Sequence, residues 1–340
     1  MQLVSQKNKP AIDSMNALRL LNQPFSLIDI DGELALAEGH ASADALKGMV
    51  LPCSIEKLGD PTFCQDHGLR YPYVGGSMAK GISSVAMAIE FGQAGMLGFF
   101  GSAGLTLETV ETAIDQLQAV APAINFGCNL IHSPNEPELE KLLVELYLRK
   151  QVRLVEASAF LALTLPVVRY RTAGIHRAVD GQIVTPNRLI AKISREEVAA
   201  RFMAPPPEKY LRKLVEAGDL TAEQAELAGQ IPMAQDVTVE ADSGGHTDNR
   251  PALSLFPTIQ SQAETFQQQY SYQQKLRIGL GGGIATPASA VAAFAMGAAY
   301  LVTGSINQAC VESGTCDTVR QMLAETRQAD ITMAPSGDTF

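Results

Sequence analysis

The stretch Gly279-Leu280-Gly281-Gly282-Gly283-Ile284 is followed, after a segment rich in alanine and valine, by Leu301-Val302-Thr303-Gly304-Ser305. Each stretch has the pattern of an apolar strand that ends in glycine. Glycine at a strand end lets the backbone approach a ligand closely and presents bare N–H groups to it. Two such ends on neighbouring parallel strands predict a phosphate-binding site, which in an eight-stranded (β/α)8 barrel follows the seventh and eighth strands.

Other glycine-rich sites fit this segment less well. A dinucleotide-binding G-x-G-x-x-G that begins at Gly279 needs a glycine at position 284, where the chain has isoleucine. No G-x-x-x-x-G-K-S/T loop for a nucleotide triphosphate occurs in the sequence. A tight turn without a ligand is the remaining alternative, and the βα spacing to the second glycine-ended stretch argues against it.

Six further strand-like runs precede these two and alternate with helix-like segments. They lie at 71–77, 96–101, 123–131, 153–157, 188–193 and 236–240. This alternation predicts a parallel sheet, and a total of eight strands favours closure into a TIM barrel over an open sheet. With glycine-ended strands in the last two positions, the pattern is typical of a barrel that binds flavin mononucleotide (FMN).

Two segments depart from the barrel rhythm. Positions 25–36 alternate apolar and polar residues about an Asp-Gly turn, which predicts a β-hairpin. We therefore expect residues 1–68 to form an N-terminal cap outside a barrel at 69–340. The connection 194–232, between the fifth and sixth strands, is too long for one barrel helix, and we expect a helical insertion that forms a lid over the site.

Composition narrows the classes of protein. With 340 residues, of which 46% are hydrophobic, the chain can bury a large core. Its apolar runs are too short to span a membrane, and the polar segment 1–10 lacks the core of a signal peptide, so we expect a cytoplasmic protein. A formal net charge of −10 argues against nucleic acid as a partner. The five cysteines are scattered without a C-x-x-C pair, which favours reduced thiols and no metal site.

The densest polar cluster follows the sixth strand, where barrel chemistry is expected. It reads Glu240-Ala241-Asp242-Ser243-Gly244-Gly245-His246-Thr247-Asp248-Asn249-Arg250-Pro251. His246 follows two glycines, so its ring can stand over a ligand, and histidine exchanges protons near neutral pH. A solvent-exposed loop histidine is the alternative, and we prefer it for the other four, His40, His67, His132 and His176.

Four other polar residues lie on or near strand ends. Lys192 has apolar neighbours, and if it faces the barrel interior it needs an anionic partner, which the pyrimidine end of a reduced flavin would provide. The other possibility is that it points outward. Asn129 can pair with donor and acceptor atoms of a flavin ring or can cap the next loop. Glu156 and Glu240 would form a carboxylate pair if they faced each other. No Ser-His-Asp order or G-x-S-x-G motif is present, which disfavours a hydrolase.

The chain resembles the PfaD family, the trans-acting enoyl reductases of polyunsaturated fatty acid synthases and trans-acyltransferase polyketide synthases. This family is a branch of the nitronate monooxygenase-like FMN barrels. The resemblance covers residues 70–335, and E-A-D-S-G-G-H-T-D-N-R-P is its most specific part. The matching motifs are Y-V-G-G-S-M-A-K-G-I at 73–82, N-L-I-H-S-P at 129–134, V-E-A-S-A-F at 155–160, A-K-I-S at 191–194, V-E-A-D-S-G-G-H-T-D-N-R-P at 239–251 and T-G-S-I-N-Q-A at 303–309.

The resemblance implies a cofactor, a reaction and a set of contacts. The FMN phosphate would lie on the backbone amides of Gly282-Gly283 and Gly304-Ser305. NADPH would reduce the flavin, which would then pass hydride to the β-carbon of an α,β-unsaturated thioester on an acyl carrier protein. His246 is the first candidate for protonating the α-carbon. The further cofactor contacts implied are Gly75, Gly76, Ser77, Met78, Asn129, Glu156, Lys192, Asp242, Ser243, Gly244, Gly245, Gly281 and Thr303. Backbone amides of 243–245 are candidates for stabilising the enolate oxygen.

Two features depart from the family pattern. Lys80 stands where an asparagine is expected, and family members usually continue well past the Met333-Ala334-Pro335 motif. Two other functions stay open. A nitronate monooxygenase would use His246 as a base and oxygen as the oxidant, and a flavin-bound scaffold subunit of a synthase would have no activity. The chain is also a candidate homodimer.

An acidic enzyme needs a local positive surface to bind an acidic carrier protein. Three arginines follow the fourth strand within a short segment, and we expect them to form that surface near the mouth of the barrel. They are Arg169, Arg171 and Arg177. The expected lid contributes further cations, Arg201, Lys209, Arg212 and Lys213.

Overall fold

The computed structural model describes residues 14–17, 20, 22–39, 41, 44–121 and 123–332. The polar segment 1–10 and the motif at 333–335 lie outside these described residues. The chain divides into two compact units, Met1–Leu58 and Gly59–Phe340. The division comes earlier than the expected boundary after residue 68, because helix α2 (Pro61–His67) belongs to the second unit.

The first unit contains a three-stranded antiparallel sheet. Strands β1 (Phe25–Ile30) and β2 (Glu33–Glu38) form the expected hairpin, and β3 (Leu46–Val50) pairs with the other edge of β1. At the turn, Asp31 and Gly32 have φ values of 53° and 88°. Positive φ at both central residues is what a two-residue hairpin turn requires, which explains the Asp-Gly pair. The short elements α1 (Ser14–Ala17) and η1 (Ile55–Lys57) complete this unit.

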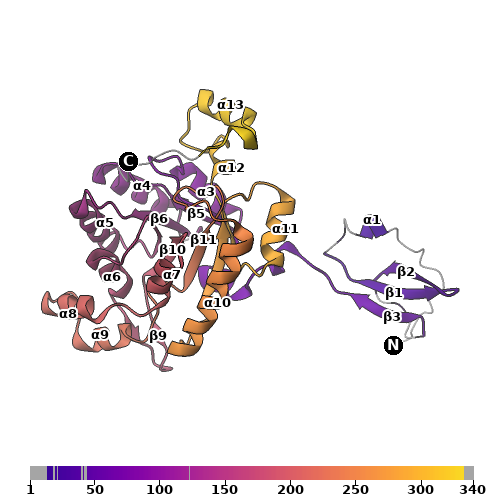
Figure 1. The fold of residues 1–340 in the computed structure, drawn as a ribbon, viewed down its shortest axis with the longest axis horizontal. Helices are drawn as coiled ribbons and strands as arrows, with labels where there is room; N and C mark the ends of the chain where they lie inside the picture. Colours follow the sequence, from indigo (N-terminus) through magenta and orange to yellow (C-terminus); the bar gives the residue numbers. More distant parts are fainter. Residues whose placement is uncertain are drawn as a thin grey trace. The chain divides into compact units, whose positions relative to one another are not determined.

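The second unit is a closed barrel of eight parallel strands, as expected for a (β/α)8 fold (Figure 1). Hydrogen bonds between β13 and β4 close it. In order around the barrel, the strands are β4 (Tyr73–Gly75), β5 (Leu97–Phe100), β6 (Phe126–Ile131), β7 (Leu154–Ser158), β10 (Arg188–Ile193), β11 (Asp236–Glu240), β12 (Arg277–Gly281) and β13 (Leu301–Thr303).

Helices surround this barrel. They are α3 (Val85–Gln93), α4 (Leu107–Val120), α5 (Pro137–Arg149), α6 (Leu165–Thr172), α7 (Glu196–Met203), α10 (Ala252–Tyr270) and α11 (Pro287–Ala295). The Thr106 side chain caps α4 by accepting a hydrogen bond from the backbone N–H of Thr109. Helix α3 contains Gly92 in its last turn and ends at Gln93. A Cβ at position 92 would lie 2.6 Å from Cβ of Ile124, so this glycine allows close packing.

The insertion after β10 is helical but does not form a lid. It contains α7, which packs on β10 and β11, followed by α8 (Glu208–Glu216) and α9 (Ala222–Ala228). Both α8 and α9 contact α6, and α9 also contacts β8 (His176–Arg177). Figure 1 shows them at the lower left, whereas the carboxyl ends of the strands point upward. Leu211 and Leu214 of α8 are buried, which fits a helix held against the barrel wall.

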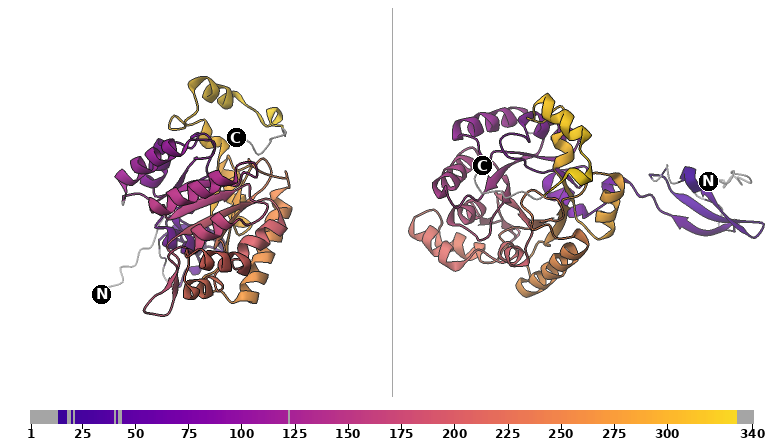
Figure 2. Two further views of the ribbon diagram at one scale, coloured as in Figure 1. Left: turned by 90° about the vertical axis from the view of Figure 1, so that its left-hand side faces the viewer. Right: turned by 45° about the horizontal axis from the view of Figure 1, so that its top comes forward.

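The β8 strand pairs with β9 (Ile183–Val184) in a small hairpin before β10. At the opposite end of the barrel unit, β13 leads into α12 (Ser305–Gln308) and α13 (Asp317–Glu325), with η2 (Gln328–Asp330) after them. Figure 2 shows this last segment, in yellow, at the end of the barrel where β13 terminates. The carboxyl ends of the strands therefore have α12 and α13 as neighbours.

Helix α2 fills the amino end of the barrel. Phe63 is fully buried and stacks on Tyr300, with ring centroids 4.1 Å apart. Beside it, Asp236 accepts two hydrogen bonds from Arg277, at 2.6 and 3.0 Å, and lies 2.9 Å from Nε2 of His67. Burial alone would raise the pKa of Asp236, but Arg277 and His67 outweigh it and lower the pKa to about 2. This buried ion pair and Phe63 attach α2 to the strands.

Candidate active site

Five polar residues meet inside the carboxyl end of the barrel, and we call them the polar network. They are Ser77, Asn129, Glu156, Lys192 and Glu240, which lie on or just after β4, β6, β7, β10 and β11. Alternate residues of a barrel strand point inward, so side chains from neighbouring strands come together there. Each member is joined to another by a hydrogen bond or an ion pair.

Lys192 points into the barrel and lies between two carboxylates. Its Nζ is 3.6 Å from Oε2 of Glu156 and 4.0 Å from Oε1 of Glu240. Burial would lower the pKa of Lys192, but the two carboxylates outweigh it and raise the pKa above its ordinary value. The anionic partner that an inward lysine needs is thus supplied by the protein itself, and Glu156 and Glu240 face the same ammonium group.

One carboxylate oxygen of Glu156 is buried and has no hydrogen-bond partner among the described residues. The residue is fully buried, and its Oε2 accepts hydrogen bonds from the backbone N–H of Ser77, at 2.8 Å, and from the Ser77 hydroxyl. Its Oε1 has no hydrogen-bond partner among the described residues and lies 3.6 Å from where a Cβ on Gly76 would be. Buried polar atoms are rarely left unpaired, so this oxygen is an acceptor that a bound water or a ligand would satisfy.

The Asn129 side chain connects β6 by hydrogen bonds to β7 and to Ser77, which follows β4. Its side-chain NH2 group lies within hydrogen-bond distance of Oγ of Ser77 (2.9 Å), Oγ of Ser158 (2.8 Å) and the Glu156 carbonyl (3.1 Å). The amide hydrogens are therefore engaged by the protein and do not cap the next loop. Asn129 supports the residues that would touch a ligand.

The glycines after β12 and β13 have different roles. A Cβ at Gly304 would meet no atom within 4 Å, so this glycine borders open space. Gly282 has φ 91°, and a Cβ there would clash with the carbonyl of Ala241, so this glycine is required by packing. Gly283, with φ 70°, is less crowded, and Ser305 is exposed at the start of α12. Among these four residues, Gly304 is therefore the glycine that leaves space free next to the backbone.

The glycine pair after β4 is explained by packing. A Cβ on Gly75 would lie 2.5 Å from the ring of Phe91, and one on Gly76 would lie 2.7 Å from Cγ1 of Val302. The backbone N–H of Gly76 donates to the carbonyl of Thr303 at 2.9 Å. These glycines let α3 and β13 approach β4 closely.

Two expected cofactor contacts are engaged within the protein. The Thr303 hydroxyl donates to the Tyr73 hydroxyl at 3.0 Å and lies 3.0 Å from the side-chain nitrogen of Asn307. The backbone N–H of Met78 donates to Oγ of Ser83 at 2.9 Å. Both residues stabilise the loops around the site.

The loop that follows β11 carries His246, which is half-buried. Asp242 has φ 45°, and its carboxylate accepts a hydrogen bond of 3.4 Å from the backbone N–H of Ala252 in the first turn of α10. Asp248 forms two hydrogen bonds of 2.8 Å with Arg195. Asp242 therefore stabilises the start of α10, and Asp248 attaches the loop to the segment after β10.

The backbone amides of 243–245 are a poorer site for an enolate oxygen than the sequence suggests. The N–H of Gly244 donates to the carbonyl of Ala241 at 2.9 Å, and the N–H of Gly245 donates to Oε1 of Glu240 at 2.9 Å. Two of the three donors in the segment are thus used within the loop. Ser243 is exposed.

Sequence reasoning missed two supporting residues. Ser158 lies two positions after Glu156 on β7, so it points to the same side of the strand, and this spacing is a signal that could have identified it. Arg195, which binds Asp248, has no such signal because the two residues come from different loops. Lys80, which departs from the family pattern, has φ 55° and donates its backbone N–H to the Ala103 carbonyl at 2.7 Å.

The arginine cluster expected to bind a carrier protein does not form a surface. Arg171 is only 3% exposed and donates to the carbonyls of Asn187 and Pro232, and burial lowers the pKa of Arg171 to about 10. Arg169 pairs with Glu145 and Asp219.

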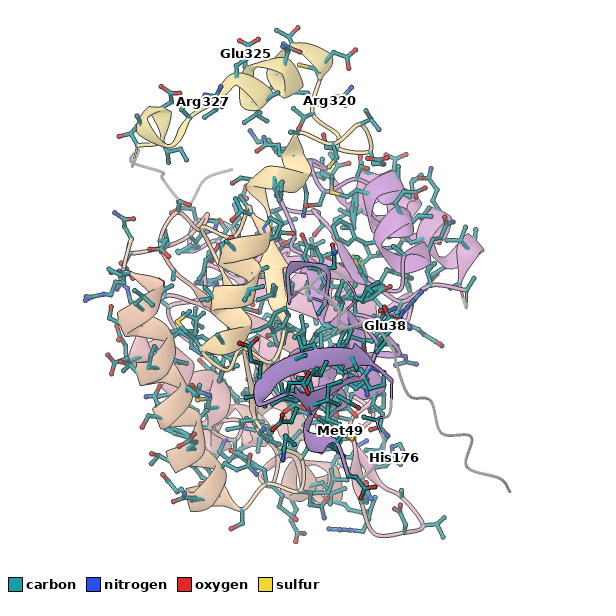
Figure 3. The ribbon with its side chains drawn as sticks, turned by 90° about the vertical axis from the view of Figure 1, so that its right-hand side faces the viewer. Glu38, Met49, His176, Arg320, Glu325 and Arg327 are labelled. Carbon is teal, nitrogen blue, oxygen red and sulfur yellow. The ribbon has the colours of Figure 1, made fainter. Side chains whose placement is uncertain are left out.

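The third arginine of that cluster, Arg177, lies on β8, next to His176. Figure 3 shows His176 near the bottom of the molecule and Arg320 of α13 at the top. Arg177 therefore lies far from the carboxyl ends of the strands. The cations of α8 are likewise on the barrel wall.

A cleft of about 510 Å³ lies elsewhere, between α10, α11 and the amino end of β12. Its polar rim includes Asp60 and Lys275, whose side chains pair with each other at 3.0 Å. The described residues contain no group of three or more His, Cys, Asp or Glu that could hold a metal ion. None of the described helices is both long and apolar enough to cross a membrane.

Together these observations define a (β/α)8 barrel with a polar network inside the carboxyl ends of its strands. No family model matches the chain. The chain is 45% identical over 325 residues to a polyunsaturated fatty acid synthase subunit of Thraustochytrium sp., and this match covers 92% of the chain and 22% of that protein. It is 46% identical over 286 residues to the polyketide biosynthesis protein PksE of Bacillus subtilis, which covers 84% of the chain and 37% of that protein.

A solved structure is also similar. The enoyl reductase domain of MlnA, from the macrolactin biosynthesis cluster of Bacillus amyloliquefaciens, superposes with a TM-score of 0.81 and is 39% identical. The match covers 84% of the chain and 64% of that domain's chain. The resemblance seen in the sequence is confirmed: the chain is homologous to a polyunsaturated fatty acid synthase subunit, to a polyketide biosynthesis protein and to this enoyl reductase domain. It spans only part of the length of each of these relatives.

Proposed function

We propose that the chain is an FMN-dependent oxidoreductase that reduces α,β-unsaturated acyl thioesters on an acyl carrier protein with NADPH. It would act in trans in polyunsaturated fatty acid or polyketide biosynthesis. The relation to an enoyl reductase domain and to two synthase proteins supports this reaction class. The structural observation that carries the proposal is the open space beside Gly304, after the last strand of the barrel, and the unpartnered Oε1 of Glu156 is consistent with it.

The residues present fit FMN. Its single phosphate suits the open space beside Gly304, where backbone amides of Gly283 and Ser305 are candidate donors. A hydroxyl or N–H of the bound cofactor would complete the hydrogen bonding of Glu156. When bound, FMN supplies reversible acceptance and donation of hydride, which no side chain of the protein can provide.

The protein's own residues would bind and orient the cofactor and would protonate the substrate. Lys192 lies between the two carboxylates of the polar network and pairs with both. Asn129 and Ser77 hold Glu156 in place. His246 would deliver a proton to the α-carbon of the thioester, a step that general acid catalysis typically accelerates by roughly 10²–10⁴-fold.

A nitronate monooxygenase remains the second candidate, because a histidine in the same loop would serve it as a base. An acyl carrier protein is the proposed partner, since the relatives include synthase subunits. Its docking surface must lie outside the arginine cluster, because Arg171 is buried and Arg169 is ion-paired.

Two measurements test the proposal. Mass spectrometry of the cofactor released from the purified protein is expected to give FMN and no FAD. NADPH oxidation is expected to depend on an added enoyl thioester such as crotonyl pantetheine. The proposal fails if the protein cannot retain FMN on refolding, or if the flavoprotein oxidises nitroalkanes with oxygen and ignores the thioester.

A further inference from the structure

The Glu240 side chain lies inside the turn of the loop that follows it. Its Oε1 accepts a hydrogen bond of 2.9 Å from the backbone N–H of Gly245 and a longer one, 3.4 Å, from that of His246. Glu240 is only 7% exposed. Gly244 has to be glycine, because any Cβ there would clash with Cγ of Glu240. The loop is therefore wrapped closely around this carboxylate.

A second contact attaches the far side of the histidine to the same residue. The hydroxyl of Thr247 donates to the backbone carbonyl of Glu240 at 2.9 Å. His246 and both of its neighbours in the chain thus bond to Glu240. Three bonds from consecutive residues to one strand-end residue leave the backbone of the histidine little freedom, and the position of its ring depends on that backbone.

A third contact comes from the barrel interior. Nζ of Lys192 lies 4.0 Å from Oε1 of Glu240 and 3.6 Å from Oε2 of Glu156, so it joins Glu240 to the neighbouring strands. Further along, Asp248 attaches the loop to Ser194 at 2.9 Å and to Arg195. The loop is therefore attached at both ends, with Glu240 holding the part that carries the histidine.

We propose that Glu240 is the positioning residue for His246. This inference rests on the proposed function, in which His246 protonates the α-carbon. Glu240 itself would touch neither substrate nor cofactor, and would act by fixing the backbone from which the imidazole projects. A misplaced acid loses rate even when its chemistry is unchanged.

The test measures the two halves of the reaction separately in the FMN-loaded protein. Glu240→Ala is expected to slow flavin reduction by NADPH much less than it slows the second half of the reaction. Reoxidation of the reduced flavin by crotonyl pantetheine should be slowed about tenfold or more, as expected for a misplaced catalytic group. Glu240→Gln keeps an oxygen that can accept from both N–H groups, so it should recover a large part of that rate. Thr247→Val, which removes the second attachment and the hydrogen bond that Thr247 accepts from the backbone N–H of Asn249, should show a smaller loss.

A double-mutant cycle separates this inference from the proposed function. His246→Ala alone should slow reoxidation strongly, and Glu240→Ala added to it should slow the reaction no further, because both changes remove the same acid. Glu140→Ala is the matched control. Glu140 is a 3% exposed glutamate on α5 that bonds His132, so its loss should affect stability and not the ratio of the half-reactions.

Each outcome decides one question. If His246→Ala slows reoxidation but Glu240→Ala does not, the positioning role is wrong and the proposed function stands. If the two changes slow the reaction independently, Glu240 acts through another group and the inference is also wrong. If His246→Ala has no effect, the role of the histidine in the proposed function fails, and the inference fails with it. If Glu240→Ala does not fold, Glu240→Gln still tests the inference. Reoxidation slowed as much by Glu240→Gln as by His246→Ala would contradict the positioning role.

Discussion

At the scale of single residues, glycines that look alike in the sequence have different tasks. Gly75, Gly76 and Gly282 are required by packing, whereas Gly304 borders open space. The role of a glycine depends on residues that are distant in the sequence but close in space, as Phe91 is to Gly75. The sequence predicts a glycine-lined site but cannot separate the two kinds.

Gly304→Val is expected to abolish FMN binding and leave the barrel folded. The valine side chain would occupy the open space, and the φ of Gly304, −129°, is not in the left-handed region. Flavin content and circular dichroism measure the two effects. Gly48→Val is the control, since its Cβ would also be uncrowded, 3.9 Å from Leu27, in the other unit. Full flavin occupancy in Gly304→Val would mean that the phosphate binds elsewhere.

Lys192→Met should destabilise the protein and weaken FMN binding. It would leave Glu156 and Glu240 without their shared cation, and removing one partner of a buried ion pair typically costs about 3–5 kcal/mol. The free energy of unfolding in urea measures this loss. Lys150→Met is the matched control, because Lys150 also pairs with two carboxylates, Glu111 and Asp115, but on the surface. Similar losses of unfolding free energy in the two variants would contradict the expectation that the buried ion pair costs more to break than the surface one.

At the scale of elements, the eight strands and most barrel helices could be predicted from the sequence, because each carries its own apolar pattern and its own capping or glycine signal. The surface against which each element packs could not be predicted from these patterns. The helices α8 and α9 were recognisable as helices, yet the surface they bury depends on α6 and β8. The prediction that Arg171 lies on a docking surface was wrong for a similar reason, because its burial follows from contacts with Asn187 and Pro232.

Helix α2 is part of the barrel core, so Phe63→Ala should lower the free energy of unfolding of the barrel. Phe63 is fully buried and stacked on Tyr300, and a buried Phe→Ala change typically costs about 3–5 kcal/mol. Phe63→Leu, which fills more of the space, should cost less. Urea denaturation gives both values. A negligible loss for Phe63→Ala would show that α2 does not belong to the core.

The buried ion pair of Asp236 predicts a loss of stability in acid. The pKa of Asp236 is lowered from 3.8 to about 2 in the folded protein. A lowered pKa means that the stabilisation is fully present above pH 3.8 and is lost as the pH falls towards 2, and it amounts to about 2 kcal/mol. Urea unfolding at several pH values measures this. Asp236→Asn should be less stable at neutral pH and show a flatter acid limb, and parallel curves for the two proteins would exclude this contribution.

At the scale of the whole molecule, the barrel brings together residues that are far apart in the chain. The polar network joins position 77 to position 240, and its position at the carboxyl ends of the strands followed from the barrel prediction. The sequence did not reveal that Glu156 and Glu240 share Lys192, because the registers of five strands decide it. It also did not reveal that Glu240 holds the loop of His246, since a turn that folds back on its own strand leaves no periodic signal.

The central claim is that this barrel transfers hydride from NADPH, by way of FMN, to an enoyl thioester. Anaerobic mixing in a stopped-flow spectrophotometer tests it most directly. We predict that NADPH bleaches the visible absorbance of the flavin, and that crotonyl pantetheine then restores it without oxygen. A bleached flavin that stays reduced with the thioester and recovers its colour only when oxygen is admitted would contradict this hydride transfer.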